Sequence, residues 1–169
     1  MTAGGSKPIL RRARAADWPD VHELLDQADA LHARLAPDYF HAGARPEAEW
    51  RRLLSDDAAC ALIAESPRPG GGAAAPGVVI GVVAGRIYET PPDPTMVARR
   101  RCHVDTLVVD ATHRRRGTGR ALLDEIGAWA RARGAAELLL TTWAGNAEAD
   151  GFYDRLGYRT LSTVRTRKL

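Results

Sequence analysis

The chain has 169 residues, of which 45% are hydrophobic and 27% are charged, and its formal net charge is +3. This length is typical of a single domain over residues 1–169 with a substantial core. The start resembles no signal peptide and no apolar run is long enough to span a bilayer, so we expect a soluble cytoplasmic protein that binds no membrane. The histidines are scattered and the two cysteines lie in apolar, strand-like contexts, which predicts no metal and two buried thiols.

The first half of the chain predicts two helices and three strands. Asp17 can cap a helix whose apolar residues recur at helical spacing, and Pro46 opens a second, shorter helix. Residues 66–77 are rich in glycine, alanine and proline, so we interpret them as a mobile hairpin tip. The strands are expected over residues 9–14, 58–65 and 78–89.

The second half is organised around residues 104–134. An apolar strand pattern ending at Val109 leads into a turn rich in arginine and glycine, and a helical pattern follows until Gly134. A continuous apolar run over residues 137–143 predicts a strand inside a sheet. A helix capped by Asn146 and closed by Gly157 comes next, and residues 158–169 can form a final hairpin.

The turn between strand and helix has the features of a phosphate-binding site. The first amides of a helix lack internal partners, and glycine at positions 117 and 119 allows an anion to approach them. Arginines at positions 114, 115, 116 and 120 add positive charge. Arg120-Ala121 replaces the Lys-Ser/Thr ending of a P-loop, and Leu122 replaces the third glycine of a dinucleotide fingerprint, which excludes both nucleotide motifs.

Two motifs resemble a known family. Arg114-x-x-Gly117-x-Gly119 after an apolar strand resembles the pyrophosphate-binding signature of the GNAT N-acetyltransferase superfamily. Downstream, Asn146-x-x-Ala149-x-x-Phe152-Tyr153-x-x-Leu156-Gly157-Tyr158 resembles the second signature of that family at the family's spacing. The resemblance implies an α/β (α+β) fold in three layers. It would have a mixed, mostly antiparallel twisted sheet of six to seven strands with helices on both faces, strands 4 and 5 being parallel and splayed.

The same resemblance implies acetyl-CoA as cosubstrate and assigns the residues that hold it. Leu107, Val108 and Val109 would act through their backbone amides on the acetyl oxygen and the pantetheine arm. Asn146 would hydrogen-bond the pantetheine, although its side chain can equally be a simple helix cap. The expected diphosphate-binding residues are Arg114, Arg115, Arg116, Gly117, Thr118, Gly119 and Arg120, with Tyr153 near the sulfur.

Acetyl transfer to an amine needs a base and a group that stabilises the departing thiolate. Tyr153 is the candidate acid, since the matching tyrosine of many family members has that role; otherwise it is a core aromatic residue. Asp105 is the candidate base because it interrupts an apolar strand where several relatives carry a glutamate. Its alternative is a carboxylate paired with an arginine, and weaker candidates for the base are Glu65, Glu89 and His103.

The sequence leaves the acceptor and the oligomeric state open. We expect acceptor specificity in the first two helices and their loop, which carries His32, Tyr39, Phe40 and His41, and in the proline loop after Glu89. The glycine turn accounts for the densest basic cluster, so no nucleic-acid partner is expected, and the chain is a monomer or a homodimer. The first hypothesis is an N-acetyltransferase; its rivals are a non-catalytic acyl-CoA-binding module and an unrelated nucleotide-binding enzyme.

Overall fold

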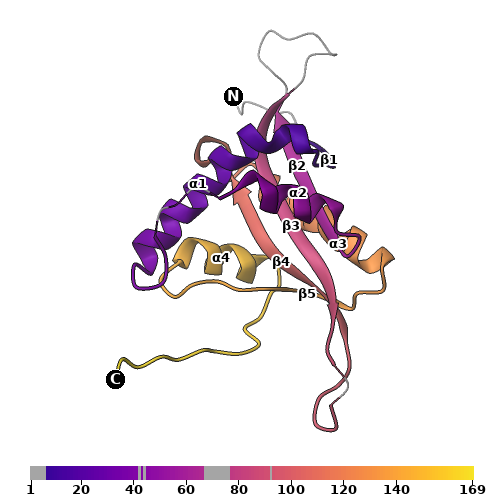
Figure 1. Ribbon diagram of the computed structural model, residues 1–169, viewed down its shortest axis with the longest axis vertical. Coiled ribbons are helices and arrows are strands. Elements are labelled where there is room, and N and C mark those ends of the chain that lie inside the picture. Colours follow the sequence, from indigo (N-terminus) through magenta and orange to yellow (C-terminus); the bar gives the residue numbers. More distant parts are fainter. Residues whose placement is uncertain (1–6, 42, 44, 67–76, 92) are drawn as a thin grey trace.

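A twisted five-stranded sheet forms the centre of the computed structural model, which describes residues 7–41, 43, 45–66, 77–91 and 93–169. The strands follow one another across the sheet in chain order, and neighbours are antiparallel except for the parallel pair β4 and β5 (Figure 1). The strands are β1 Ile9–Arg12, β2 Ala59–Ser66, β3 Val78–Glu89, β4 Arg100–Val109 and β5 Glu137–Leu140.

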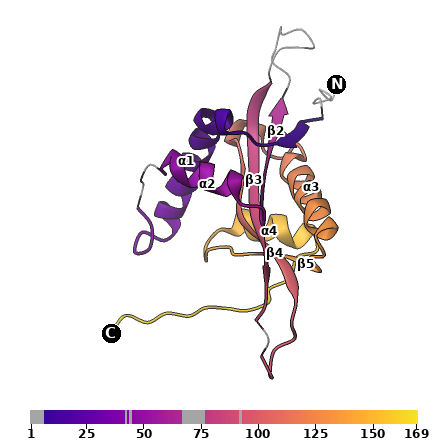
Figure 2. The ribbon, with the colours of Figure 1, turned by 45° about the vertical axis from the view of Figure 1, so that its right-hand side comes forward.

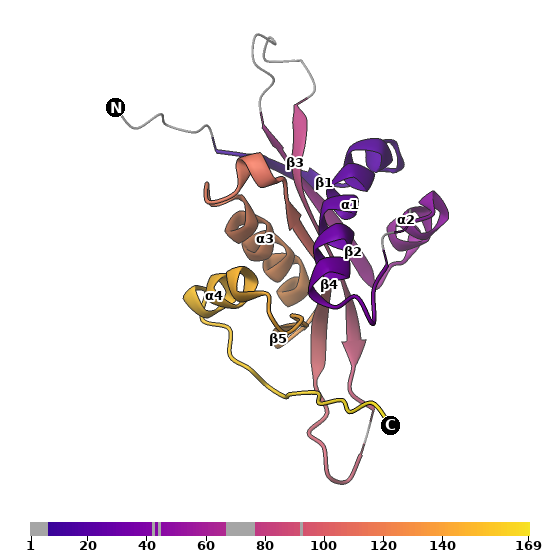
Figure 3. The same ribbon diagram turned by 90° about the vertical axis from the view of Figure 1, so that its left-hand side faces the viewer.

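Helices cover both faces of this sheet. In Figures 2 and 3, α1 and α2 lie on one face, and α3 and α4 lie on the other, which gives the three layers that the sequence predicts. The helices are α1 Trp18–Leu35, α2 Glu47–Ser55, α3 Thr118–Ala132 and α4 Ala147–Arg155, with short 3₁₀ turns η1 Ala15–Asp17 and η2 Ala111–His113. None of the helices in the described ranges has the length and apolar character needed to cross a bilayer.

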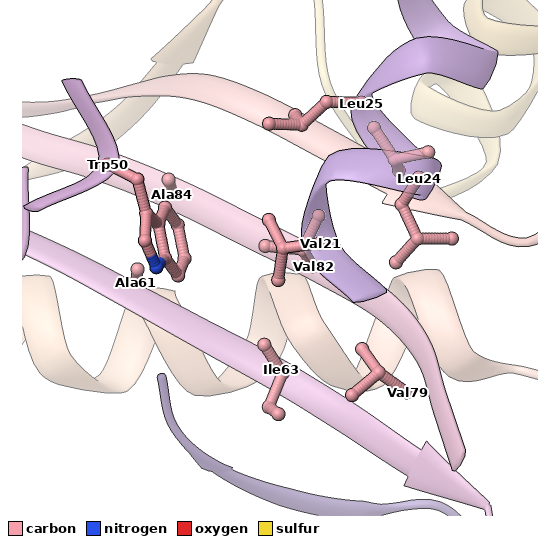
Figure 4. Packing of buried hydrophobic residues seen from close by; sticks show 10 residues of the cluster. Val21, Leu24, Leu25, Trp50, Ala61, Ile63, Val79, Val82 and Ala84 are labelled. Carbon is pink, nitrogen blue, oxygen red and sulfur yellow. The ribbon is translucent and has the colours of Figure 1, made fainter. Parts of the chain in front are cut away.

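Two apolar layers hold the helices to the sheet. Under α1 and α2, Val21, Leu24 and Trp50 pack against side chains of β2 and β3 (Figure 4). On the other face, α3 buries Leu122, Leu123 and Ile126. The two cysteines, Cys60 and Cys102, are buried free thiols, as expected. Burial raises the pKa of Cys102 to about 11, so this thiol stays protonated and unreactive.

Strand β4 contains a bulge at the position of the candidate base. Ala84 of β3 pairs with Thr106, and the next residue, Gly85, pairs with Val104, so Asp105 is the extra residue. Val104 and Leu107 both pack on the α3 face although they are three positions apart, which confirms that the side-chain alternation is reset between them. A Cβ built on Gly85 would lie 2.6 Å from the carbonyl oxygen of His103, so only glycine fits opposite the bulge.

The sequence overestimates the number of strands, since the described chain forms five and the prediction was six to seven. Residues 158–169 were expected to make a hairpin, but the chain after Gly157 runs extended and joins no sheet. From residue 159 onward, its backbone makes no hydrogen bond to another backbone group in the described chain. Strand β5 ends at Leu140 rather than at Trp143. The expected mobile tip falls largely on residues 67–76, outside the described ranges, although Ser66 does pair with Val78.

Candidate functional site

The turn after β4 presents backbone amides to solvent. Gly117 has φ 84° and is the N-terminal cap of α3, and Arg115, with φ 60°, is the one non-glycine residue in the described chain with positive φ. The carbonyl oxygen of Gly117 accepts from Ala121, which leaves the three preceding amides of α3 without helical partners. Nothing lies within 4 Å of a Cβ built on Gly117. This open turn therefore suits an anion.

Asp110 fixes the approach to the turn. Its carboxylate accepts hydrogen bonds from the backbone N–H and the hydroxyl of Thr112, from the Gln27 side chain on α1 and from the His113 ring. These donors hold the pKa of the Asp110 carboxyl well below its ordinary range. Arg114 then ties the strand to α4, because its Nε donates to the Val109 carbonyl oxygen at 3.2 Å and its guanidinium pairs with Glu148.

The second glycine of the motif serves packing. Gly119 lies in the first turn of α3, and a Cβ built there would come 3.2 Å from Cζ of Phe152 on α4. The absence of a side chain thus lets α3 and α4 approach each other beneath the turn. Gly117 supplies the left-handed backbone, so the two glycines have different physical roles.

A cavity of about 650 Å³ opens beside the turn, where β4 and β5 separate. The two strands pair only as far as Val104 and Leu140, whereas β4 continues to Val109. The splay predicted for these strands is therefore present, and residues from β4, α1, α3, α4 and the segment after β5 line the space between them. The candidate residues among them are Asp105, Leu107, Val108, Val109, Arg114, Arg115, Gly117, Thr118, Gly119, Arg120, Asn146 and Tyr153.

Tyr153 of α4 and Asn146, the N-terminal cap of that helix, both line this cavity. Tyr153 lies between the rings of Phe152 and Tyr158, with centroid separations of 5.2 and 5.4 Å, and burial raises its pKa to about 12. The phenol is therefore neutral at physiological pH and can donate a hydrogen bond into the cavity. Asn146 caps α4 by accepting from the Ala149 N–H at 3.3 Å, which leaves its side-chain NH₂ group free to donate.

Asp105 lines the cavity from the bulge and is held by two neighbours. One carboxylate oxygen lies 2.8 Å from Nδ1 of His103, and the other accepts from Nε of Arg86 at 3.3 Å. Asp105 therefore has the arginine partner that the sequence left open as its alternative role, and it also lines the cavity. Among the weaker candidates, Glu65 binds Arg11 and Glu89 binds Arg100, and neither lines the cavity.

Part of the cavity lining is apolar and aromatic. It includes Leu25, Ala28 and Leu31 of α1 and Trp143 of the segment after β5. An aromatic cluster surrounds Trp143. The ring of Phe40 lies edge-on to Trp143 with a centroid separation of 4.6 Å, and it lies 5.1 Å from the ring centroid of His32. The ring centroid of Tyr39 is 5.4 Å from that of Trp143. Arg45 also lines the cavity, with its guanidinium on the carboxylate of Asp29.

A family model for GNAT acetyltransferases matches residues 18–158, which run from the start of α1 to the end of the second motif. The chain belongs to the GNAT acetyltransferase family. The match covers both motifs, so the family expected from those residues is confirmed.

The chain is also similar in sequence to a human protein and in fold to two solved structures. Human N-acetyltransferase 8 is 27% identical over 109 residues, a match that covers 64% of this chain and 42% of the relative's own length. A tetramutant of the BH1408 protein from Bacillus halodurans superposes with a TM-score of 0.87 at 23% identity, covering 95% of this chain and 99% of that one. The aminoglycoside N-acetyltransferase AAC(6')-Iy in complex with CoA superposes with a TM-score of 0.68 at 17% identity, covering 95% and 98%.

Within this GNAT fold, all but one of the expected catalytic and cofactor-binding residues line the cavity. Arg116 is the exception, since its side chain is exposed and lies outside the cavity lining. Asp110 and Trp143 were not singled out as site residues. Asp110 could have been found from the Asp-x-Thr pattern of a side-chain-capped turn, whereas nothing local marks Trp143. No group of three or more potential metal ligands occurs in the part of the chain that the structure describes.

Proposed function

We propose that this chain is an acetyl-CoA-dependent N-acetyltransferase that transfers the acetyl group directly to a primary amine. The observation that carries the proposal is the cavity between the splayed strands. It joins the open amides at the start of α3 to a carboxylate in the β4 bulge and a neutral phenol on α4. Acetyl-CoA bound with its diphosphate at the turn would place its thioester in this space, where an amine could reach it.

The diphosphate of CoA fits the turn. Three helix amides, the left-handed backbone at Arg115 and Gly117, and the arginine side chains at 114, 115 and 120 converge on the rim of the cavity. Helix ends alone contribute only about 0.3–1 kcal/mol to binding an anion, so the amides and arginines must act together. Pairing with β5 ends at Val104, so the β5-facing side of the backbone at Leu107, Val108 and Val109 and the NH₂ group of Asn146 are then available to the pantetheine arm.

Asp105 is proposed as the base. An alkyl amine with a pKa near 10.4 is mostly protonated at pH 7, a handicap of roughly 4–5 kcal/mol. Asp105 would take the proton from the amine, directly or through water, and His103 at 2.8 Å offers that proton a route to solvent. The amine nitrogen then bonds to the acetyl carbon as the carbon–sulfur bond breaks. Neither buried cysteine lines the cavity, which supports transfer without an acyl-enzyme.

Tyr153 is proposed to stabilise the departing thiolate. Its pKa of about 12 keeps the phenol protonated, so it can donate a hydrogen bond to the sulfur as negative charge develops. An ordinary thiol has a pKa near 8.5, so complete transfer of the phenolic proton to the thiolate would be uphill by roughly 5 kcal/mol. Hydrogen-bond donation is therefore the step we assign to this residue.

The apolar part of the cavity lining favours an acceptor amine with an apolar or aromatic body. The described lining contains two carboxylates, Asp105 and Glu148, and Glu148 is already paired with Arg114. A polycationic acceptor would meet too few free acidic groups there, whereas Trp143 and Leu31 offer an apolar surface. A small arylalkyl amine or the amine of an apolar peptide segment fits this chemistry.

The test is acetyl-CoA turnover over a panel of aryl, alkyl and polycationic amines with wild type, Tyr153→Phe and Asp105→Asn. We expect turnover of apolar monoamines by the wild type and a strong loss in both variants. If both variants keep full turnover, the roles proposed for Tyr153 and Asp105 are wrong. The proposed acetyltransferase reaction would still stand.

One observation favours a second function, an acyl-CoA-binding module without catalysis. Asp105 is engaged by both Arg86 and His103, which would suit a structural carboxylate. Tight CoA binding without transfer to any amine in the panel would support this alternative.

A further inference from the structure

A second hollow, of about 240 Å³, opens at the β1–β2 edge of the sheet and shares no lining residue with the cavity beside β4. Strand β1 pairs with β2 only as far as Arg12, opposite Leu62, whereas β2 begins at Ala59. After Arg12 the chain turns away into η1, with one further backbone bond from the N–H of Ala13 to the carbonyl oxygen of Ala61. The hollow therefore lies where β2 extends beyond its edge neighbour.

Two arginines line this hollow from different elements, Arg12 at the end of β1 and Arg133 as the C-terminal cap of α3. Both guanidinium groups lie over the ring of Trp129 on α3, with their central carbons 5.7 and 4.6 Å from its centroid. Neither forms an ion pair with a carboxylate in the described part of the chain, whereas the neighbouring Arg11 has two such partners. Two adjacent cations repel each other, so an anion between them would be stabilised.

The same hollow also carries groups that accept hydrogen bonds. Asp56 and Asp57 line it. Asp56 already accepts from the N–H of Ala58 at 2.9 Å, whereas Asp57 makes no hydrogen bond or ion pair with a described residue. Residues two apart in a strand face the same neighbour, so Ala59 presents its carbonyl oxygen to the same side as Ala61. Among the described residues, no donor binds that oxygen.

A ligand of this hollow has to match both signs of charge. A phosphate chain would be repelled by Asp56 and Asp57, and an amine alone would be repelled by the two arginines. A molecule that carries one carboxylate and one ammonium group satisfies both sets. The fork of a guanidinium group suits a carboxylate, and a carboxylate together with a carbonyl oxygen suits an ammonium group with its three donors.

The size of the hollow limits the ligand further. Pockets for drug-sized molecules have about 300–1,000 Å³, so a hollow of about 240 Å³ suits a smaller molecule. We propose that this hollow binds a free α-amino acid with a short side chain. Its carboxylate would lie on Arg12 and Arg133, and its ammonium group on Asp57 and the carbonyl oxygen of Ala59. The site does not depend on the proposed acetyl transfer, because the cavity lies toward the opposite edge of the sheet.

The first test locates the binding site by nuclear magnetic resonance. The isotope-labelled full chain is titrated with L-serine, and the backbone amide resonances are followed. We expect saturable shifts that are largest at Arg12, Ala59 and Arg133. An amino acid is itself an amine, so this map also separates the hollow from the cavity. No saturation at millimolar concentrations, or shifts that are largest at Val108 and Asn146, would overturn the proposal.

The second test uses matched variants. Arg12→Gln and Arg133→Gln each remove one cation from the hollow and should raise the Kd of L-serine at least about tenfold. Both side chains are exposed, so the substitutions should leave the fold intact. Arg131→Gln is the control, because that exposed arginine of α3 lies outside the hollow, and it should leave the Kd unchanged. Equal effects of all three changes would assign binding to net charge and reject the site.

The need for both charges is tested on the wild type with simpler probes. Acetate carries the carboxylate alone and ethylamine carries the ammonium group alone, so each should bind at least about tenfold more weakly than L-serine. If acetate or inorganic phosphate binds as tightly as L-serine, the hollow is only an anion site and the assignment to an amino acid is wrong.

Discussion

Gly119 and Phe152 lie so close that a methyl group on the glycine would come 3.2 Å from the ring of the phenylalanine. The contact joins the first turn of α3 to α4, which carries Tyr153. The positions of the proposed diphosphate site and of the phenol are therefore coupled through one small residue.

This contact predicts how alanine at position 119 behaves. Alanine is a better helix former than glycine by about 1 kcal/mol, but here it must displace Phe152. We expect Gly119→Ala to weaken CoA binding while changing the free energy of unfolding by no more than about 1 kcal/mol. In a Phe152→Leu background, which gives the methyl group room, the same change should cost less affinity. Equal losses of affinity in both backgrounds, measured by calorimetry, would rule out this coupling.

Tyr153 should affect the rate and leave CoA affinity unchanged. Removal of the hydroxyl in Tyr153→Phe is expected to lower kcat by about 10²-fold or more, the usual effect of removing one hydrogen-bond donor to a developing negative charge. Tyr158→Phe is the matched control, because that ring contacts Tyr153 but lies outside the cavity lining. The measurements are kcat and the Kd of CoA for each variant. An equal effect of the two changes would assign the loss to packing.

Arg86 should position the base. Arg86→Gln removes the guanidinium that donates to one oxygen of Asp105 at 3.3 Å, so the carboxylate is less well placed for the amine. We therefore expect Arg86→Gln to lower kcat by less than Asp105→Asn, which removes the base and should lower the rate by about 10²-fold or more. The measurement is kcat for each variant. An unchanged kcat in both variants would point to a different base.

The arginines of the turn should differ in their effect on CoA. Arg115 and Arg120 line the cavity and Arg116 does not, although all three side chains are exposed. Arg115→Gln and Arg120→Gln are expected to raise the Kd of CoA several-fold at low salt and less at high salt, because exposed charges are screened. Arg116→Gln should have a much smaller effect. Titrations of CoA at two ionic strengths test this prediction. Equal increases in Kd for all three variants would indicate that the arginines act only through long-range charge.

Asp110 should make the free energy of unfolding depend on pH in the acidic range. Its pKa is lowered in the folded state, so its contribution is present above the ordinary aspartate pKa of about 3.9 and is lost as the pH falls below it. Asp110→Ala is expected to lower the free energy of unfolding at neutral pH by about 0.5–2 kcal/mol, as for loss of a helix cap. The variant should also lose less stability than wild type on acidification. Urea unfolding at several pH values measures both effects, with the exposed Asp124→Ala as control.

The sequence predicts most of what depends on local physics. The bounds of β3 agree with the prediction, Asn146 caps its helix and Gly117 takes the left-handed conformation that glycine permits. The bulge at Asp105 was not predicted, because register is a property of two strands. Gly85 was a signal for it, since an isolated glycine in a strand often marks a bulge. Residues 158–169 have strand propensity, but propensity does not determine a pairing partner, and this is why the predicted hairpin was wrong.

The aromatic contacts around Trp143 could not be predicted from local sequence patterns either. Phe40 and His32 were named as candidates from residue type, but their common neighbour Trp143 lies about a hundred positions later in the chain. Only the packing of the α1–α2 loop against the segment after β5 brings them together.

The extra residue in β4 also bears on how this protein can change. Without Asp105, Val104 and Leu107 would stand two positions apart, and regular alternation would still place both on the α3 face. The packing of the sheet therefore does not require the bulge. If descendants of this sequence nevertheless keep the extra residue, selection acts on the cavity that it lines and not on the core.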